Sequence, residues 1–173
     1  NEMHGGQRVP NFDYAMAEGV KKSFRKEYYT WMYAALKLKC SMNEEQALAQ
    51  IDRFKTEMKT DLRMGNVEEW EAELGTLSYE GVSAAQIQCA HRFAVKEALK
   101  STDKQTYQAM EAFVHNLNTM NSRAGAQVPF SSINYGTDTS PEARMVIRNL
   151  LSATADGLGG GETPIFPVQI FKV

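Results

Sequence analysis

The sequence has little cysteine, no long apolar run and no surplus of positive charge. Its two cysteines, Cys40 and Cys89, stand far apart without CxxC or Cys/His spacing. This usage fits reduced cytosolic thiols better than a disulfide framework or a metal site. No run approaches roughly 18 apolar residues, and no basic and apolar leader opens the chain. The sequence therefore predicts a cytoplasmic protein without a membrane-spanning segment.

The formal net charge of −2 argues against a general nucleic-acid binder, because affinity for a phosphate backbone comes from clustered surplus Lys and Arg. The apolar fraction of 43% and the charged fraction of 23% are ordinary for a globular protein. A chain of 173 residues is long enough for one domain with a core of its own. This charge, composition and length are compatible with a pocket that binds a single nucleotide.

Four helices are predicted in the first two-thirds of the chain, over residues 13–39, 43–64, 67–74 and 82–118, the last with a possible break at 101–103. Apolar residues recur in the first range at three- and four-residue steps: Val20, Phe24, Tyr28, Trp31, Ala35 and Leu38. The second range carries a similar stripe: Ala47, Ile51, Phe54, Met58 and Leu62.

The predicted ends of these helices depend on a few polar residues and one glycine. Asp13 is a candidate N-cap for the first helix, and Asn43 with Gln46 resembles a capping box at the start of the second. Gly65 is expected to close the second helix.

The last third of the chain predicts a strand, a helix and a second strand. The first strand covers Gly125–Gly136, and Pro129 limits its ladder hydrogen bonds. The helix begins with Ser140 as N-cap, Pro141 in the first position and Glu142 in the first turn, and ends near Gly157. An apolar strand follows at residues 165–173. A βαβ unit of this length predicts parallel, neighbouring strands in an α/β sheet or barrel.

Two features of this last third suggest an anion site, and each has a structural alternative. The turn Gly159–Gly161 precedes a strand, whereas phosphate-binding glycine loops precede a helix, so a simple turn is favoured. The helix start at Ser140 presents free N–H groups that suit an anion. A helix capped by its own serine explains the same residues.

Polar residues are concentrated in the segment 118–132, where a long helix passes into a strand. Amides and hydroxyls gathered in such a loop suit a sugar or phosphate, although a structural turn is the alternative. A second candidate is the basic patch of Lys21, Lys22, Arg25 and Lys26, which is either a solvated helix face or an anion site. The three histidines have no metal-site spacing, and no catalytic triad is identifiable.

Several stretches resemble the class III anaerobic ribonucleotide reductases, which are glycyl-radical enzymes. They are His4–Gln7 with Phe12–Tyr14, then Val114–Asp138, Thr139–Arg144 and Gly161–Val168. The stretch 40–101 is only loosely similar to the family. The resemblance covers the start and the last third of the chain.

The resemblance implies an α/β fold in which this chain is a helix-rich fragment of a ten-stranded barrel. It forms one partial domain over 1–173, mainly helical over 1–120 and strand–helix–strand over 121–173. The implied reaction converts ribonucleoside triphosphates to deoxyribonucleotides: a thiyl radical abstracts the ribose 3′-hydrogen, the 2′-hydroxyl leaves as water, and formate supplies the reducing equivalents. Implied cofactors are a glycyl radical, installed by a radical S-adenosylmethionine activating enzyme with an iron–sulfur cluster, and a structural zinc.

The resemblance also implies site residues and partners for this chain. Lys26, with Lys22 one turn away, matches a contact to a nucleoside triphosphate effector at a homodimer interface. The candidates for substrate binding follow from the polar segment: Asn118, Ser122, Gln127, Ser131 and Ser132. The family's radical cysteines, glycyl radical and zinc ligands have no counterpart here, so we assign no catalytic or metal residue and expect the fragment alone to be inactive and, with open sheet edges, to self-associate.

Two other functions stay open at this point. One is a free-standing helical module that binds nucleotides or dimerises without catalysis. The other is a different glycyl-radical enzyme that acts on a small carbon substrate.

Overall fold

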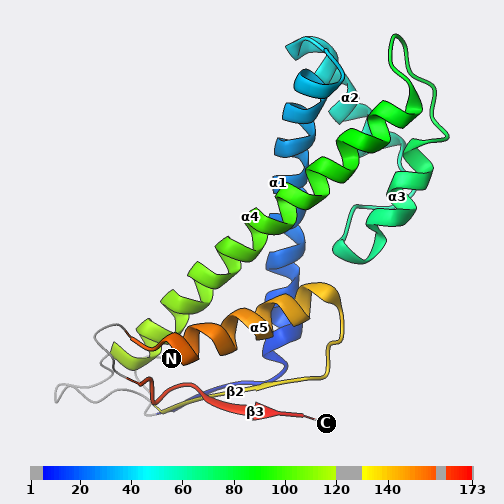
Figure 1. Ribbon diagram of the computed structural model, residues 1–173. Coiled ribbons are helices and arrows are strands. Elements are labelled where there is room, and N and C mark those ends of the chain that lie inside the picture. The colour runs from blue at the N-terminus through cyan, green and yellow to red at the C-terminus, as the bar shows by residue number, and fades with distance from the viewer. Residues whose placement is uncertain (1–5, 120–129, 159–162, 173) are drawn as a thin grey trace. The chain divides into compact units, whose positions relative to one another are not determined.

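The computed structural model describes residues 6–119, 130–158 and 163–172, which are mostly helical with one small parallel sheet (Figure 1). The chain divides into two compact units: residues 1–20 with 103–173, called the sheet unit, and residues 21–102, called the helical unit. The single partial domain stays a prediction. None of the described helices has the length and apolar character needed to cross a bilayer.

The elements follow one another in this order: β1 (Gly6–Val9), α1 (Phe12–Lys39), α2 (Glu44–Glu57), a short 3-10 helix (Met64–Asn66), α3 (Val67–Leu74), α4 (Ala84–Thr119), β2 (Phe130–Tyr135), α5 (Pro141–Asp156) and β3 (Val168–Phe171). Both α1 and α4 contribute residues to the two units.

The core of the helical unit is formed by side chains from α1, α2, α3 and α4. Helix α4 contributes a stripe of small residues, with Ala90, Ala94 and Ala98 fully buried at four-residue steps. Small side chains leave room for large ones on neighbouring elements, among them the fully buried Trp70 and Phe54. The predicted stripe on α1 is wrong at its end, because Leu38 is 82% exposed in the last turn of the helix.

Helix α2 starts as predicted but ends earlier. The Asn43 side chain accepts from the Gln46 N–H at 2.8 Å, and the Gln46 side chain accepts from the Asn43 N–H at 3.0 Å, which confirms the capping box. The helix ends at Glu57 instead of near residue 64, because the backbone turns extended at Met58. The following segment buries Leu62 completely, and Trp70 Nε1 donates to the carbonyl of Thr60 at 3.0 Å.

Gly65 lies inside the 3-10 helix and does not close α2, whereas α3 has the predicted bounds. Helix α4 runs without a break through residues 101–103. Ser101 and Asp103 have side-chain partners that do not disturb the helix: Ser101 Oγ accepts from Trp31 Nε1 at 3.3 Å, and Asp103 Oδ1 accepts from the side chains of Arg148 at 2.7 Å and Asn149 at 3.0 Å.

The described residues of the sheet unit form three parallel strands in the order β1, β2, β3. The βαβ unit of β2, α5 and β3 is confirmed, as are the Ser140 cap and Pro141 in the first turn of α5 (Figure 1). The final strand is shorter than predicted and covers four residues. Strand β1 was not predicted, and residues 125–129 of the first predicted strand lie outside the described residues. The ten-stranded barrel stays a prediction.

Asp13 does not cap α1, which begins one residue earlier at Phe12. Its buried carboxylate instead accepts three backbone N–H groups: Oδ1 accepts from Tyr14 at 2.9 Å, and Oδ2 accepts from Gly136 and Asp138 at 3.0 Å each. Asp13 therefore fixes the turn after β2 to the start of α1. Gly136 has a φ of 110°, and a Cβ there would lie 2.5 Å from the carbonyl oxygen of Lys172.

Candidate functional site

Lys22 and Lys26 line one hollow on the helical unit, which we call the basic hollow. Its volume is about 510 Å³, and its walls are Lys22, Arg25, Lys26, Tyr29, Thr30, Lys55 and Asp61. The α1 residues recur at three- and four-residue steps, so they share one face of the helix. Lys55 comes from α2, and Asp61 comes from the extended segment after it. The predicted basic patch therefore included Lys22, Arg25 and Lys26 of this hollow but not Lys55 or Asp61.

The basic hollow holds four cationic side chains against one carboxylate, in a chain whose net charge is −2. Lys22 and Lys26 are exposed and form no ion pair within the described part of the chain. Lys55 Nζ lies 4.9 Å from the centre of the Tyr29 ring, and Arg25 Nε donates to the carbonyl of Leu62 at 3.4 Å. An excess of cations around an aromatic ring favours an anionic ligand.

Tyr29 supplies a hydroxyl that stays protonated at neutral pH. Burial raises the pKa of Tyr29 to about 12, with Arg25 lowering it and Asp61 raising it by smaller amounts. The hydroxyl can therefore donate a hydrogen bond to a phosphate or sugar oxygen, while the ring offers a flat apolar surface.

The Asn118 amide is engaged entirely with the protein backbone. Its Nδ2 donates to the carbonyls of Val114 at 2.7 Å and Phe166 at 2.6 Å, and its Oδ1 accepts from the N–H groups of Ile165 and Phe166 at 2.9 Å each. These bonds hold the segment before β3 against the end of α4. In this structure Asn118 positions backbone, and its amide has no capacity left for a ligand.

The other predicted substrate contacts are only partly described. Ser132 lies on β2 and is 9% exposed. Ser131 also lies on β2, but its side chain is outside the described residues, as are Ser122 and Gln127 entirely. These four residues stay predictions.

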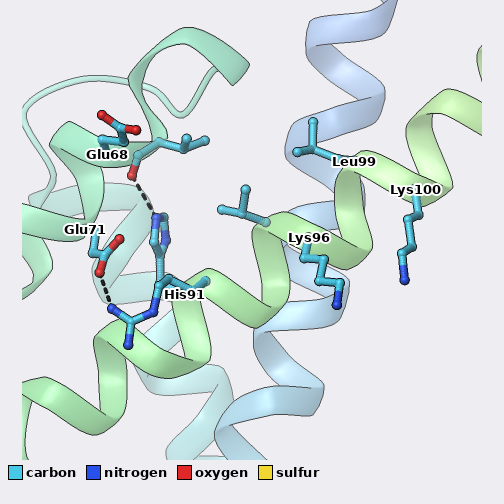
Figure 2. A pocket seen from close by; sticks show the side chains of 9 residues that line it. Glu68, Glu71, His91, Lys96, Leu99 and Lys100 are labelled. Carbon is cyan, nitrogen blue, oxygen red and sulfur yellow. Dashed lines mark hydrogen bonds and ion pairs between the residues drawn. The ribbon is translucent and has the colours of Figure 1, made fainter.

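A second hollow on the helical unit, the His91 hollow, has a volume of about 310 Å³ (Figure 2). Its lining comes from α3 and α4: Val67, Glu68, Glu71, His91, Arg92, Val95, Lys96, Leu99 and Lys100. Glu71, which lies near the imidazole of His91 in Figure 2, forms an ion pair with Arg92. No local sequence pattern indicates this hollow, since its residues come from two separate helices of the weakly similar stretch.

His91 is buried, and both of its ring nitrogens have partners. Nε2 lies 2.8 Å from the carbonyl of Val67, and Nδ1 lies 2.7 Å from the hydroxyl of Tyr28. A carbonyl only accepts, so Nε2 carries the proton and Nδ1 accepts from Tyr28. Burial lowers the pKa of His91, against smaller raising effects of Val67 and Glu71. His91 is therefore a neutral structural residue and offers no free base to the hollow.

The Cys40 thiol has no sign of activation. Burial raises the pKa of the Cys40 thiol, whereas a reactive thiol needs a lowered pKa. Cys89 is exposed on α4. Among the described residues, no group of three His, Cys, Asp or Glu side chains has a geometry that would hold a metal ion.

Comparison with known proteins decides the family. The family model of the anaerobic ribonucleoside-triphosphate reductases matches residues 1–173. The chain belongs to this family. The resemblance in the sequence is thereby confirmed, and the alternative of a different glycyl-radical enzyme is wrong.

Three anaerobic ribonucleoside-triphosphate reductases illustrate the likeness. The enterobacteria phage T4 protein is 37% identical over 95 residues, which cover 52% of this chain and 16% of that protein. The Salmonella typhimurium protein is 31% identical over 77 residues, 44% of this chain and 11% of that protein. The Escherichia coli protein is 32% identical over 73 residues, 42% of this chain and 10% of that protein. The matched part thus spans less than a fifth of each relative.

Proposed function

We propose that the whole protein containing this chain is an anaerobic reductase that converts ribonucleoside triphosphates to deoxyribonucleotides. Family membership over all 173 residues supports this proposal. A glycyl radical would supply the radical chemistry, an S-adenosylmethionine activating enzyme would install it, and a structural zinc would be held elsewhere in the protein. The proposed compartment is the cytoplasm.

The basic hollow is the proposed site for a nucleoside triphosphate effector. Its excess of cations, which is the observation that carries this proposal, suits the triphosphate, and the Tyr29 ring offers a surface for the base. Lys22 and Lys26, without ion pairs of their own in the described residues, would contact phosphate oxygens. The proposed partner is a second copy of the protein in a homodimer, in which the effector sets the choice of substrate.

The segment 118–132 is the proposed contribution to substrate binding. Asn118 would act by positioning, because its hydrogen bonds hold the chain before β3. Ser122, Gln127, Ser131 and Ser132 stay candidates for direct contacts. The catalytic radical groups would come from other parts of the protein, so these 173 residues alone would not turn over substrate.

A double variant tests the effector proposal in the full-length protein. Lys22→Ala/Lys26→Ala should weaken binding of a nucleoside triphosphate by at least about tenfold, since each lost contact is a charge-assisted hydrogen bond. Calorimetric titration measures this. The matched control is Lys96→Ala/Lys100→Ala, which removes two charges at the same four-residue spacing from the His91 hollow.

The control separates the loss of contacts in the basic hollow from a general loss of positive charge. Equal weakening of nucleotide binding in both variants would contradict the effector proposal.

An assay of ribonucleotide reduction decides between the reductase function and a module that binds nucleotides without catalysis. A protein that binds nucleotides at the basic hollow but never reduces them would be a nucleotide-binding or dimerisation module without catalysis.

A further inference from the structure

The His91 hollow has an apolar strip between two charged helix faces. The apolar strip consists of Val67 from α3 with Val95 and Leu99 from α4. Val95 and Leu99 are four residues apart, so they lie one above the other on the same face of α4. Leu99 is 36% exposed, and the strip therefore presents apolar surface to solvent.

The α4 side of the hollow is basic. Arg92, Lys96 and Lys100 follow one another at four-residue steps, and Figure 2 shows the Lys96 and Lys100 side chains extending from α4 in the same direction. Arg92 pairs with Glu71, and Lys100 pairs with Glu97 at 3.7 Å. Lys96 is exposed and forms no ion pair among the described residues. A partner can therefore approach a free cation here.

The α3 side of the hollow is acidic, with Glu68 and Glu71 one position and four positions into the helix from Val67. Glu71 is engaged with Arg92. Glu68 is exposed and has no ion pair in the described part of the chain. A free carboxylate on α3 thus faces the same hollow as the free ammonium of Lys96 on α4, and the apolar strip belongs to both helices.

This combination suits a protein helix better than a nucleotide. The lining residues, all of them described, include no Phe, Tyr or Trp on which a base could stack, and the carboxylates of α3 repel phosphates. An amphipathic helix carries apolar side chains at three- and four-residue steps with charged side chains on both flanks. Its turns repeat every 5.4 Å or so, as do those of α4, so one apolar side chain per turn matches Val95 and Leu99.

We propose that the His91 hollow binds an amphipathic helix of another protein. Apolar side chains of that helix occupy the apolar strip, a carboxylate on one flank pairs with Lys96, and a cationic side chain on the other flank pairs with Glu68. The hollow shares no lining residue with the basic hollow, so this surface is separate from the proposed nucleotide site. The inference goes beyond the reductase function and does not depend on it.

Two synthetic helical peptides test the proposal on the full-length protein, with binding measured by fluorescence anisotropy. The acidic-flank peptide has leucines at positions i and i+4, a glutamate after each leucine and lysines on the opposite flank. The basic-flank peptide differs only in having lysine in place of each glutamate. The acidic-flank peptide should bind at least about threefold more tightly, because its carboxylates pair with Lys96 instead of meeting it with a like charge.

Charge reversal at Lys96 provides the decisive variant. Lys96→Glu should weaken the acidic-flank peptide by about three- to tenfold and strengthen the basic-flank peptide, which reverses the preference. A merely structural role of Lys96 would not produce this reversal. The matched control is Lys104→Glu, the same change at an exposed position of α4 outside the hollow, which should leave both affinities unchanged.

The apolar strip has a variant of its own. Leu99→Glu should weaken both peptides by about tenfold or more, because the bound helix would bury a carboxylate against its leucines. Thermal unfolding of Lys96→Glu and Leu99→Glu checks that both variants fold, as their partial exposure leads us to expect.

Three results would overturn the proposal. One is equal affinity for the two peptides, or a preference that Lys96→Glu leaves unchanged. Another is that neither peptide binds, which would show that a different part of the full-length protein covers the hollow. The third is self-association of the protein that Leu99→Glu abolishes, which would assign the hollow to a second copy. None of these results bears on the reductase proposal, which nucleotide binding and reduction test separately.

Discussion

Buried polar side chains in this chain are of two kinds, those whose hydrogen bonds are complete within the described residues and those whose bonds are not. Asp13 and His91 are of the first kind, since donors or acceptors of the protein engage both carboxylate oxygens and both ring nitrogens. Asn134 of β2 is of the second kind, because its buried Oδ1 has no hydrogen-bond partner there. A buried side chain whose hydrogen bonds are all formed stabilises the fold, whereas one that lacks a hydrogen-bond partner indicates a contact with a ligand or with a further protein segment.

The completed environment of His91 predicts a pH dependence of stability. Burial lowers the pKa of His91, so the folded chain resists the proton that the unfolded chain takes up below about pH 6.5. The stabilisation is therefore fully present above that pH and is lost as the pH falls toward the folded-state pKa. We expect the free energy of unfolding to decrease from about pH 7 to about pH 5, measured by chemical denaturation.

His91→Gln should flatten this dependence, because a glutamine amide still donates to Val67 and accepts from Tyr28 but does not titrate. The matched control is His115→Gln, which removes an exposed histidine from the same helix. A pH slope that survives in His91→Gln but disappears in His115→Gln would contradict the assignment.

At the scale of elements, the sequence predicted those whose signals are local. The capping residues of α2 and α5 and the bounds of α3 are examples. Strand β1 was missed because it has four residues and pairs with β2 more than a hundred residues later, so no local pattern indicates it. The early end of α2 was missed for a similar reason, since it depends on burial of Leu62 and on the Trp70 hydrogen bond.

The capping box of α2 predicts a measurable contribution to stability. Asn43→Ala removes the acceptor for the Gln46 N–H and should lower the free energy of unfolding by about 0.5–2 kcal/mol. Urea denaturation measures the change. Asp52→Ala, an exposed position in the middle of the same helix, is the control and should have little effect. Equal losses in both variants would show that helix propensity, not the cap, sets the stability of α2.

At the scale of the whole molecule, two compact units have separate cores, and this predicts separate responses to core mutations. Phe54 is fully buried in the helical unit and Leu150 in the sheet unit. Phe54→Ala should cost about 3–5 kcal/mol and Leu150→Ala about 2–5 kcal/mol. Amide hydrogen exchange should rise first in α2 and α3 for Phe54→Ala, and first in α5 and β2 for Leu150→Ala.

Each of these two variants is the control for the other. An identical rise of exchange across both units in both variants would show that the chain opens as one cooperative body, contrary to this prediction.

Sequence spacing predicts the residues of a candidate site when they lie on one helix, but not when tertiary packing or strand pairing brings them together. Lys22 and Lys26 stand on one helix face, so their spacing alone places them together. Lys55, from α2, joins them only through tertiary packing, which no local pattern encodes. Strand pairing places Ser132, a predicted substrate contact, next to Arg8 of β1, which lies more than a hundred residues earlier.

The turn after β2 has a consequence for the sequences of related proteins. A side chain at position 136 would meet both an unfavourable φ and the carbonyl oxygen of Lys172. Any residue other than glycine is therefore disfavoured at position 136, as long as the turn is hydrogen-bonded to Asp13 and lies next to the end of β3. In an alignment of relatives, we expect a glycine column here, paired with an aspartate column more than a hundred positions earlier.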